Sequence, residues 1–262
     1  MITSQQHDYH NITEAPGMKA TREQLERLYH RYRFALEFAC GKDVLEVACG
    51  SGIGLGFLAG SAKTVVGGDI DVKNLSVARQ IYKDTPIAIQ GMNAHNLPFK
   101  QESFDSILLF EAVYYLDRPD YFLKEASRVL RRDGKLIICT VNKDWKDFHP
   151  SPYAHVYYSV LELSSLLKGT FRHVQIFGAF PTMNGGIRDR FLSGLKRMAV
   201  HFDLIPGSLK ARSYLKRLFI GPLQPLPERI IDGMARYEPP IPIGPDDPNR
   251  VYKIIYAVAR KS

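Results

Sequence analysis

Residues 43–54 read Asp-Val-Leu-Glu-Val-Ala-Cys-Gly-Ser-Gly-Ile-Gly, and residues 65–69 read Val-Val-Gly-Gly-Asp. An apolar run that ends in a glycine-rich turn, followed by an apolar run that ends in a carboxylate, is typical of a site for a nucleoside-carrying cofactor. The dinucleotide fingerprint needs glycine at its first, third and sixth positions. Counting from Gly50 puts Leu55 at the sixth position, and the frame that starts two residues later also lacks its third glycine. The spacing therefore disfavours NAD and FAD as the cofactor.

A different arrangement fits the same stretch. An acidic side chain stands four positions before the first glycine, with Glu46 ahead of Gly50 and Gly52. This pattern resembles the first motif of class I S-adenosylmethionine-dependent methyltransferases. In that family the second strand ends in an acidic residue that holds the ribose, and Asp69 matches it. The resemblance implies S-adenosylmethionine as the cofactor.

Later motifs of the same family follow in the expected order. Residues 91–99 resemble the next motif, although Asn93-Ala94 stands where the family commonly has Asp-Ala. Residues 103–110 resemble the fourth strand, and residues 125–138 resemble the helix exit Glu-Ala-x-Arg-Val-Leu-x-x-Gly-Gly. The similarity covers roughly residues 40–141 and is greatest to the methyltransferase type 11 group. It implies that the chain is a methyl-transferring enzyme.

The order of the expected elements indicates a doubly wound α/β fold. Strands alternate with helices, and the strands are near-continuous apolar runs, which is typical of a parallel sheet covered on both faces. In such sheets ligands bind beyond the carboxyl ends of the strands, where the motif residues lie. The resemblance implies a mostly parallel, seven-stranded, Rossmann-like methyltransferase fold with a C-terminal helical insertion before the last strand. The predicted strands are 44–47, 64–68, 87–90, 106–110, 135–141, 174–177 and 251–258, and the predicted helices include 21–39, 118–130 and 158–167.

Length and composition bound the organisation of the chain. Its 262 residues suffice for one large α/β domain with a sizeable core. Scattered cysteines, a polar start and the lack of an apolar stretch of roughly 18 to 20 residues predict a soluble, cytoplasmic protein. We expect a single methyltransferase domain over 1–262, with a cap helix in 1–40, a cofactor-binding core in 41–180, a basic helical insertion or lid in 181–248 and a final strand in 249–262.

The positive charge is concentrated in one segment. Residues 186–220 carry eight Lys or Arg against two Asp, and so account for most of the net charge of +8. One hypothesis is that this segment contacts an anionic acceptor or the inner membrane surface, to which the enzyme would be peripheral. The alternative is a solvated lid whose apolar stripe packs on the sheet. Docking of RNA or protein is a third use, although the absence of an RNA-binding module disfavours nucleic acid.

The resemblance assigns a role to each motif residue. Backbone amides at the glycine turn would receive the methionine carboxylate, Glu46 would hold the amino group and Asp69 would accept both ribose hydroxyls. Asn93 would accept the exocyclic amine of adenine, as a weaker acceptor than the carboxylate of the family. Each has a simpler alternative: packing for the glycines, a helix N-cap for Asp69 and a turn for Asn93. The expected cofactor-binding residues are Glu46, Ala48, Gly50, Gly52, Asp69, Ile70, Asn93, Ala94 and Phe110.

Residues beyond the fourth and fifth strands are expected to select the acceptor. Residues 110–113, Phe-Glu-Ala-Val, are not the Asn/Asp-Pro-Pro-aromatic sequence of enzymes that methylate DNA amino groups or protein glutamine, and no Cys follows a Pro, as cytosine-C5 enzymes require. We expect a small-molecule acceptor, with a sugar or glycan-precursor hydroxyl ahead of a quinone or other metabolite. The alternatives are methylation of RNA or protein, and a cofactor-binding protein without turnover.

A hydroxyl acceptor must lose its proton, so a general base would be useful. The candidates for this base are Glu111, His149 and His155. The expected walls of the acceptor pocket are Tyr114, Tyr115, Asn142, Trp145, Tyr153 and Tyr157. Residues 9–17 and the helical residues 21–32 are expected to close over the cofactor. No metal-ligand cluster is apparent in the sequence, so no metal is expected, and the oligomeric state is left open.

Overall fold

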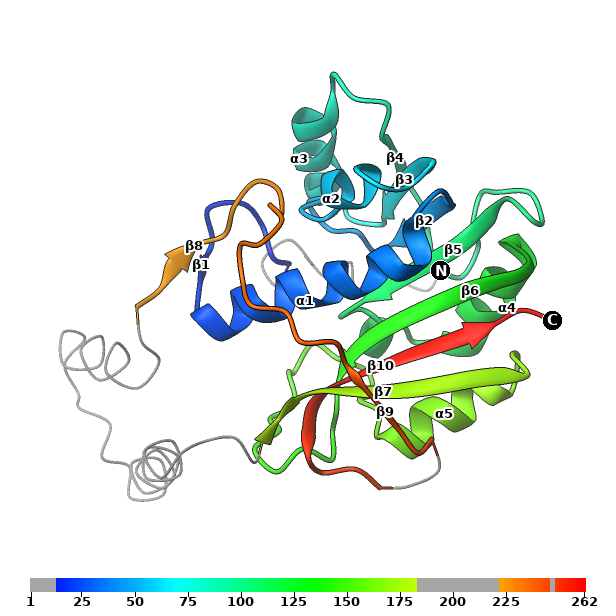
Figure 1. The fold of residues 1–262 in the computed structure, drawn as a ribbon. Coiled ribbons are helices and arrows are strands. Elements are labelled where there is room, and N and C mark those ends of the chain that lie inside the picture. Colours follow the sequence, from blue (N-terminus) through cyan, green and yellow to red (C-terminus); the bar gives the residue numbers. More distant parts are fainter. Residues whose placement is uncertain (1–12, 183–221, 246–247) are drawn as a thin grey trace, which may run out of the picture.

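The computed structural model describes residues 13–182, 222–245 and 248–262, in which one mixed sheet lies between two layers of helices (Figure 1). The strand order is β4-β3-β2-β5-β6-β10-β7-β9. In that order the strands are Ala88–Gly91, Thr64–Asp69, Asp43–Val47, Phe104–Phe110, Leu130–Val141, Tyr252–Arg260, His173–Pro181 and Ile241–Ile243. The helices are α1 (Arg22–Ala39), α2 (Leu55–Ala59), α3 (Val72–Tyr82), α4 (Pro119–Val129) and α5 (Val160–Lys168), with the short 3-10 helix η2 (Val113–Tyr115).

Both faces of the sheet are buried, as the apolar strands predict. Side chains alternate between the faces along a strand. On β6, Leu136 and Ile138 pack in the cluster that contains α4 and α5, whereas Ile137 and Cys139 pack in the cluster that contains α1 and α2. Figure 1 shows α1 crossing one face of the sheet. The doubly wound α/β architecture is confirmed.

Over the residues that the structure describes, the sheet has eight strands, one more than the seven predicted. Strands β4, β3, β2, β5 and β6 are parallel, and β10 lies antiparallel between β6 and β7. The additional strand is β9, which pairs antiparallel with β7 through Gly178↔Ile241 and Ile176↔Ile243. It has only three residues, one of them Pro242, so it shows no alternating pattern in the sequence. A proline is tolerated there because β9 is an edge strand.

Helix α1 is held at both ends by local signals. Its N-cap Thr21 forms a capping box with Gln24, in which the Thr21 Oγ1 accepts from the Gln24 amide at 3.1 Å and the Gln24 Oε1 accepts from the Thr21 amide at 2.8 Å. The helix ends before Gly41, which adopts a φ of +67°. Buried His30 fixes its rotation, because its ring nitrogens lie 2.7 Å from the Tyr256 hydroxyl and 2.7 Å from the Glu238 carbonyl.

Residues 222–238 run over α1 and return to the N-terminal segment. Strand β8 (Gln224–Pro225) pairs with β1 (Lys19–Ala20), and Figure 1 shows the two side by side. The Ile230 amide donates to the Ile53 carbonyl at 3.1 Å. The Tyr29 hydroxyl donates to Asp232 at 2.7 Å. These residues, which belong to the predicted insertion 181–248, are therefore part of the layer that covers the sheet.

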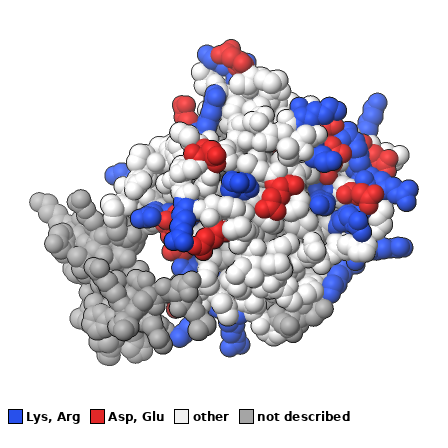
Figure 2. Space-filling model, viewed as in Figure 1, with Lys and Arg blue, Asp and Glu red and all other residues white. Residues whose placement is uncertain are grey.

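The charged surface seen in Figure 2 mixes the two signs. Over the described residues on this face, Lys and Arg lie beside Asp and Glu. The ion pairs within the described residues include those of Arg131, which lies 2.8 Å from Asp43 and 2.9 Å from Asp105. This view shows no continuous patch of one sign among the described residues. The predicted basic segment 186–220 lies outside the described residues.

Candidate active site

A cavity of about 710 Å³ opens beyond the carboxyl ends of β2, β3, β4, β5 and β6. Its position agrees with the rule for ligands of doubly wound sheets. The predicted site residues that line it are Glu46, Ala48, Gly50, Asp69, Ile70, Asn93, Ala94, Phe110, Glu111, Tyr114, Tyr115 and His155. The predicted site residues that do not line it are Gly52, Asn142, Trp145, His149, Tyr153 and Tyr157.

The turn after β2 is a run of left-handed backbone. Ala48, Gly50 and Gly52 have φ values of 57°, 55° and 77°. A Cβ on Gly50 would lie 2.5 Å from the Thr13 Cγ2, so the glycine admits the N-terminal segment onto the turn. A Cβ on Gly52 would lie 3.1 to 3.2 Å from side chains behind the turn, and its carbonyl accepts from the Tyr82 hydroxyl at 2.8 Å. Gly52 is therefore needed for packing, whereas Gly50 also reaches the cavity.

Asp69 presents a fixed carboxylate to the cavity. Its Oδ2 accepts from the Gly50 amide at 2.8 Å and its Oδ1 accepts from the Asp71 amide at 2.8 Å. Burial raises the pKa of Asp69, and these amides oppose the rise. The N-cap of α3 is Asp71, so that alternative role does not fall to Asp69. Each Asp69 oxygen retains a lone pair with which to accept a hydroxyl.

Glu46 is a second buried carboxylate at the cavity. Its Oε1 accepts from the Tyr32 hydroxyl at 2.5 Å, and its buried Oε2 has no hydrogen-bond partner. Burial raises the pKa of Glu46 to about 7. The Tyr32 ring packs against the backbone of Gly54, where a Cβ would lie 2.0 Å from the ring. An unsatisfied acceptor inside a cavity fits an ammonium group.

Arg31 places a buried cation at the cavity. It forms an ion pair with Glu14, whose carbonyl accepts from the Ser51 hydroxyl at 3.0 Å, and its Nε has no partner. Its charge lowers the pKa of both Glu46 and Glu111, against the larger effect of burial. Neither Arg31 nor Glu14 was expected as a site residue, although they lie in the segments 21–32 and 9–17 that were expected to close over the cofactor. The sequence signal for Arg31 is an arginine inside the apolar stripe of α1.

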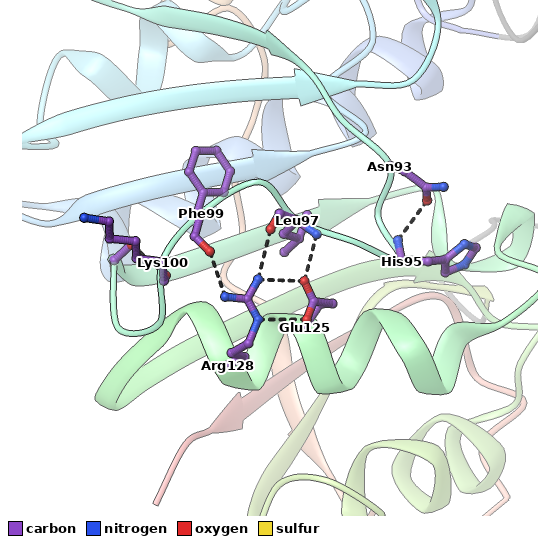
Figure 3. A network of polar contacts seen from close by, with 8 residues as sticks. Asn93, His95, Leu97, Phe99, Lys100, Glu125 and Arg128 are labelled. Carbon is purple, nitrogen blue, oxygen red and sulfur yellow. Dashed lines mark hydrogen bonds and ion pairs between the residues drawn. The ribbon is translucent and has the colours of Figure 1, made fainter.

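The loop after β4 brings Asn93 and Ala94 to the cavity. The Asn93 Oδ1 accepts from the His95 amide at 2.9 Å (Figure 3). The Asn93 side chain therefore forms a turn and also lines the cavity, so the two roles foreseen for it do not exclude each other. Its oxygen keeps a second lone pair, and its amide group is a donor. His95 Nε2 lies 3.4 Å from Asp117 Oδ1, which lines the same rim.

The far side of the cavity is built after β5. Glu111 has a φ of 49°, an uncommon value for a non-glycine residue, and strain of this kind is often found at functional sites. Its Oε2 accepts from the Tyr114 hydroxyl at 3.1 Å. Burial raises the pKa of Glu111, and Arg31 and Arg27 oppose the rise. The Tyr114 and Tyr115 rings lie 4.5 Å apart and form an aromatic wall.

Known proteins are similar to this chain in sequence and in fold. Residues 45–138 match the family described as a methyltransferase domain, of type 11. The ubiquinone biosynthesis O-methyltransferase of Bartonella bacilliformis is 28% identical over 129 residues, which are 48% of this chain and 52% of that protein. A probable S-adenosylmethionine-dependent methyltransferase of Mycolicibacterium smegmatis is 30% identical over 147 residues, 55% and 54% of the two chains. The chain thus spans about half the length of these relatives.

A solved structure extends the similarity of the fold to the whole chain. It is an S-adenosylmethionine-dependent methyltransferase of Thermotoga maritima, described as a possible histamine N-methyltransferase. The TM-score is 0.57 over 98% of this chain and 99% of that chain, at 17% identity. Residues 45–138 thus form a methyltransferase domain of this family, and the fold around them is that of the class I S-adenosylmethionine-dependent methyltransferases. S-adenosylmethionine is its cofactor, and the unpartnered Glu46 oxygen beside the Asp69 carboxylate fits that molecule.

Asn142 serves the sheet of the methyltransferase and does not reach the cavity. It is buried at the end of β6, and its Nδ2 donates to the Asn249 carbonyl at 2.6 Å and the Tyr252 carbonyl at 3.0 Å. Its Oδ1 accepts from the Asp144 amide at 3.1 Å. The side chain ties the start of β10 to the end of β6, which explains why a polar residue is buried there.

The remaining predicted wall residues do not line the cavity. Trp145 stacks with Arg27 and Lys253, whose charged groups lie 5.9 and 5.3 Å from its ring. Tyr157 packs behind Tyr114, at 4.8 Å between rings. His149 and Tyr153 are exposed on the same loop. Of the predictions beyond β6, only His155 lines the cavity, and it is exposed at the rim.

Two properties of the methyltransferase bear on its partners. Within the described residues, no group of three or more His, Cys, Asp or Glu side chains is placed to hold a metal ion. Among the helices of residues 13–182, 222–245 and 248–262, none combines the length and apolar character that crossing a bilayer requires.

Proposed function

We propose that the methyltransferase transfers a methyl group to an oxygen atom of a small-molecule acceptor. The observation that supports this most directly is the Glu111 carboxylate, which lines the cavity in a strained conformation and is held by Tyr114. A hydroxyl acceptor loses a proton when it is methylated, and a carboxylate with a raised pKa can take it. Glu111 would be the general base in this proposal.

The cofactor side would be arranged around two carboxylates. When bound, S-adenosylmethionine supplies a methyl group on a sulfonium sulfur for in-line displacement. The free Glu46 oxygen would receive the amino group, and Asp69 would receive the ribose hydroxyls. The Gly50 amide already donates to Asp69, so we assign the methionine carboxylate to buried Arg31. Ile70, Asn93 and Ala94 would surround the adenine.

The acceptor side favours a hydroxyl on an aromatic or otherwise apolar framework. Tyr114, Tyr115, Leu116 and Val141 contribute walls there, which would cover the flat face of a phenol. The relative from Bartonella is named as an O-methyltransferase of ubiquinone biosynthesis. We therefore place a phenolic acceptor, such as a quinone precursor, ahead of the sugar hydroxyl favoured by the sequence. The sugar acceptor stays a prediction to be tested beside it.

The test is methyl transfer from labelled cofactor to a panel of acceptors. The panel contains dihydroxyphenols, quinone precursors, sugar nucleotides, fatty acids, and bulk tRNA and rRNA. We expect labelled ether from a phenolic acceptor with stoichiometric S-adenosylhomocysteine. Label on nitrogen, carbon or RNA would contradict the proposal. Cofactor binding without transfer to any member would favour the alternative of a catalytically silent protein.

The basic segment 186–220 has a separate test. If it contacts an anionic or membrane surface, reversing the charge of Arg212, Lys216 and Arg217 should weaken binding to vesicles that contain anionic lipid, with a strong dependence on salt. Unchanged binding and activity would remove this hypothesis and leave a solvated lid.

A further inference from the structure

The Glu-Ala-x-Arg motif on α4 grips the loop that carries Asn93. Glu125 and Arg128 lie on the side of α4 that faces residues 93–99 (Figure 3). The Leu97 amide donates to Glu125 Oε2 at 2.8 Å. Arg128 donates from Nη2 to the Leu97 carbonyl at 2.9 Å and from Nη1 to the Phe99 carbonyl at 2.7 Å. Both polar groups of the Leu97 backbone are therefore bound by this pair.

The pair is itself rigid. Arg128 Nε donates to Glu125 Oε1 at 2.8 Å, and Nη2 donates to Glu125 Oε2 at 2.7 Å. The hydrogen bond from Arg128 lowers the pKa of Glu125, so the carboxylate stays charged at neutral pH. A two-pronged contact of this kind fixes the plane of the guanidinium group, which a lysine ammonium cannot reproduce.

Between the sheet and this contact with α4, the loop has few other restraints. It leaves the sheet at Gly91, the last residue of β4. Residues 93–96 are otherwise held by an isolated bridge between Asn93 and Asn96, by the Asn93 turn, and by the contact of His95 Nε2 with Asp117 Oδ1 at 3.4 Å. Leu97 is buried, so the grip acts at the point where the loop returns to the core. The cavity-lining residues Asn93, Ala94 and His95 lie between these two anchors.

We propose that Glu125 and Arg128 are positioning residues for adenine recognition, which hold the Asn93 turn at the distance from the cavity where it reads the exocyclic amine. This inference rests on the proposed placement of adenine beside Asn93. Glu125 and Arg128 lie on α4 and do not line the cavity, so their role in the cofactor site is indirect.

The competing role is stabilisation of the fold alone, and the chain offers a matched control for it. Arg131 follows α4 closely, its side chain is 38% exposed against 37% for Arg128, and it also joins separate segments by ion pairs, to Asp43 and Asp105. The ion pairs of its guanidinium group run to Asp43 and Asp105 and not to residues 93–99. A variant of Arg131 therefore reports the cost of losing a comparable ion pair at the other end of the sheet.

The experiment compares Arg128→Lys, Glu125→Gln and Arg131→Lys in the full chain. Calorimetry gives the Kd of S-adenosylhomocysteine and of S-inosylhomocysteine, in which an oxygen replaces the exocyclic amine. We expect the wild-type protein to prefer the adenosyl compound. Arg128→Lys should weaken its binding about tenfold and reduce the preference, because the turn is displaced. Glu125→Gln keeps the shape of the side chain and should act in the same direction.

The control separates positioning from stability. Arg131→Lys should leave the ratio of the two Kd values unchanged even where it lowers Tm. A ratio that stays at the wild-type value in Arg128→Lys and Glu125→Gln overturns the inference, as does an equal change in Arg131→Lys. A wild-type protein that binds both compounds equally overturns adenine reading while leaving the cofactor site in place. A wild-type protein that binds neither overturns the proposed site, and the inference falls with it.

Discussion

The cavity has a cofactor side, built after β2, β3 and β4, and an acceptor side, built after β5 and β6. The two sides differ in how many of their predicted residues line the cavity. On the cofactor side, Glu46 lies within β2 near its carboxyl end, Asp69 ends β3 and Asn93 follows β4 closely, and all three line the cavity. On the acceptor side, the residues after β5 line it, but most of those predicted after β6 do not. Parallel pairing of neighbouring strands explains why the predictions on the cofactor side are correct, since pairs such as Val47↔Gly68 and Asp69↔Gly91 align the strand ends. The irregular segment 142–158 has no such partner.

Substituting Glu111→Gln tests the acceptor half, and we expect it to have the largest effect. Glutamine keeps the shape and can accept from Tyr114, but it cannot take a proton. We expect kcat to fall by roughly 10² to 10⁴, with the Kd of S-adenosylhomocysteine unchanged. Because burial raises the pKa of Glu111 from 4.5, wild-type kcat/KM should rise with pH through that raised pKa, and the variant should lack this limb. A variant with wild-type kcat would exclude Glu111 as the base.

Substituting Asp69→Asn tests the cofactor half. The variant loses the charge and one of the two oxygens to which backbone amides donate. We expect the Kd of S-adenosylhomocysteine, measured by calorimetry, to rise about 100-fold. The matched control is Asp71→Asn, which keeps an N-cap on α3 and does not line the cavity, and should stay within about twofold. Equal losses in both variants would show that Asp69 acts only through the loop.

The pKa of Glu46 predicts a pH dependence of cofactor binding. Below a pKa of about 7 the carboxyl group is protonated in the free protein and cannot pair with an ammonium group. The Kd of S-adenosylhomocysteine should therefore rise by about tenfold for each pH unit below 7 and be flat above it. Calorimetry in buffers of different ionisation enthalpy should detect proton release near pH 6. Glu46→Gln should abolish this dependence, and its persistence would assign the proton to another group.

The same shift has a consequence for stability. The pKa of Glu46 is raised on folding, from 4.5 to about 7, so the native state holds this proton more tightly than the unfolded state. The free energy of unfolding of the cofactor-free protein should consequently fall as the pH rises from 4.5 to about 7. Denaturant titrations of the wild type and Glu46→Gln across this range test the sign.

Substituting Asn142→Ala should separate structure from chemistry on the acceptor side. The change leaves the Asn249 and Tyr252 carbonyls without their donor. We expect the free energy of unfolding to fall by about 1 to 3 kcal/mol, with kcat of the folded protein unchanged. A selective loss of kcat would return Asn142 to the acceptor pocket.

The smallest effects are expected at the exposed residues of the same loop. His149→Gln and Tyr153→Phe should each change kcat by less than about twofold and the free energy of unfolding by less than about 0.5 kcal/mol. A loss of activity at His149 would mean that the loop moves onto the cavity when an acceptor binds. His155→Gln is the variant to compare with His149→Gln, because His155 lines the cavity and His149 does not.

Tyr32 and Gly52 illustrate the limit of sequence patterns within the site itself. The helical spacing of α1 predicts that Tyr32 faces the core, which is correct. It does not specify that the hydroxyl meets Glu46, because that depends on how α1 crosses the sheet. Gly52 belongs to the cofactor motif, yet its surroundings are Leu55, Ala78 and Tyr82, and only the packed structure distinguishes this glycine from Gly50.

The sequence by itself determined the doubly wound fold, the cofactor and the two carboxylates, Glu46 and Asp69, that line the cavity. These depend on local patterns: apolar strands, a glycine turn, and an acidic residue within or at the end of each of two strands that the parallel sheet brings together. Only the tertiary structure decided that β9 adds an eighth strand, that Asn142 joins two strands, and that Glu125 and Arg128 hold the Asn93 turn. Each of these depends on contacts between segments that are distant in the chain, which residue spacing does not encode.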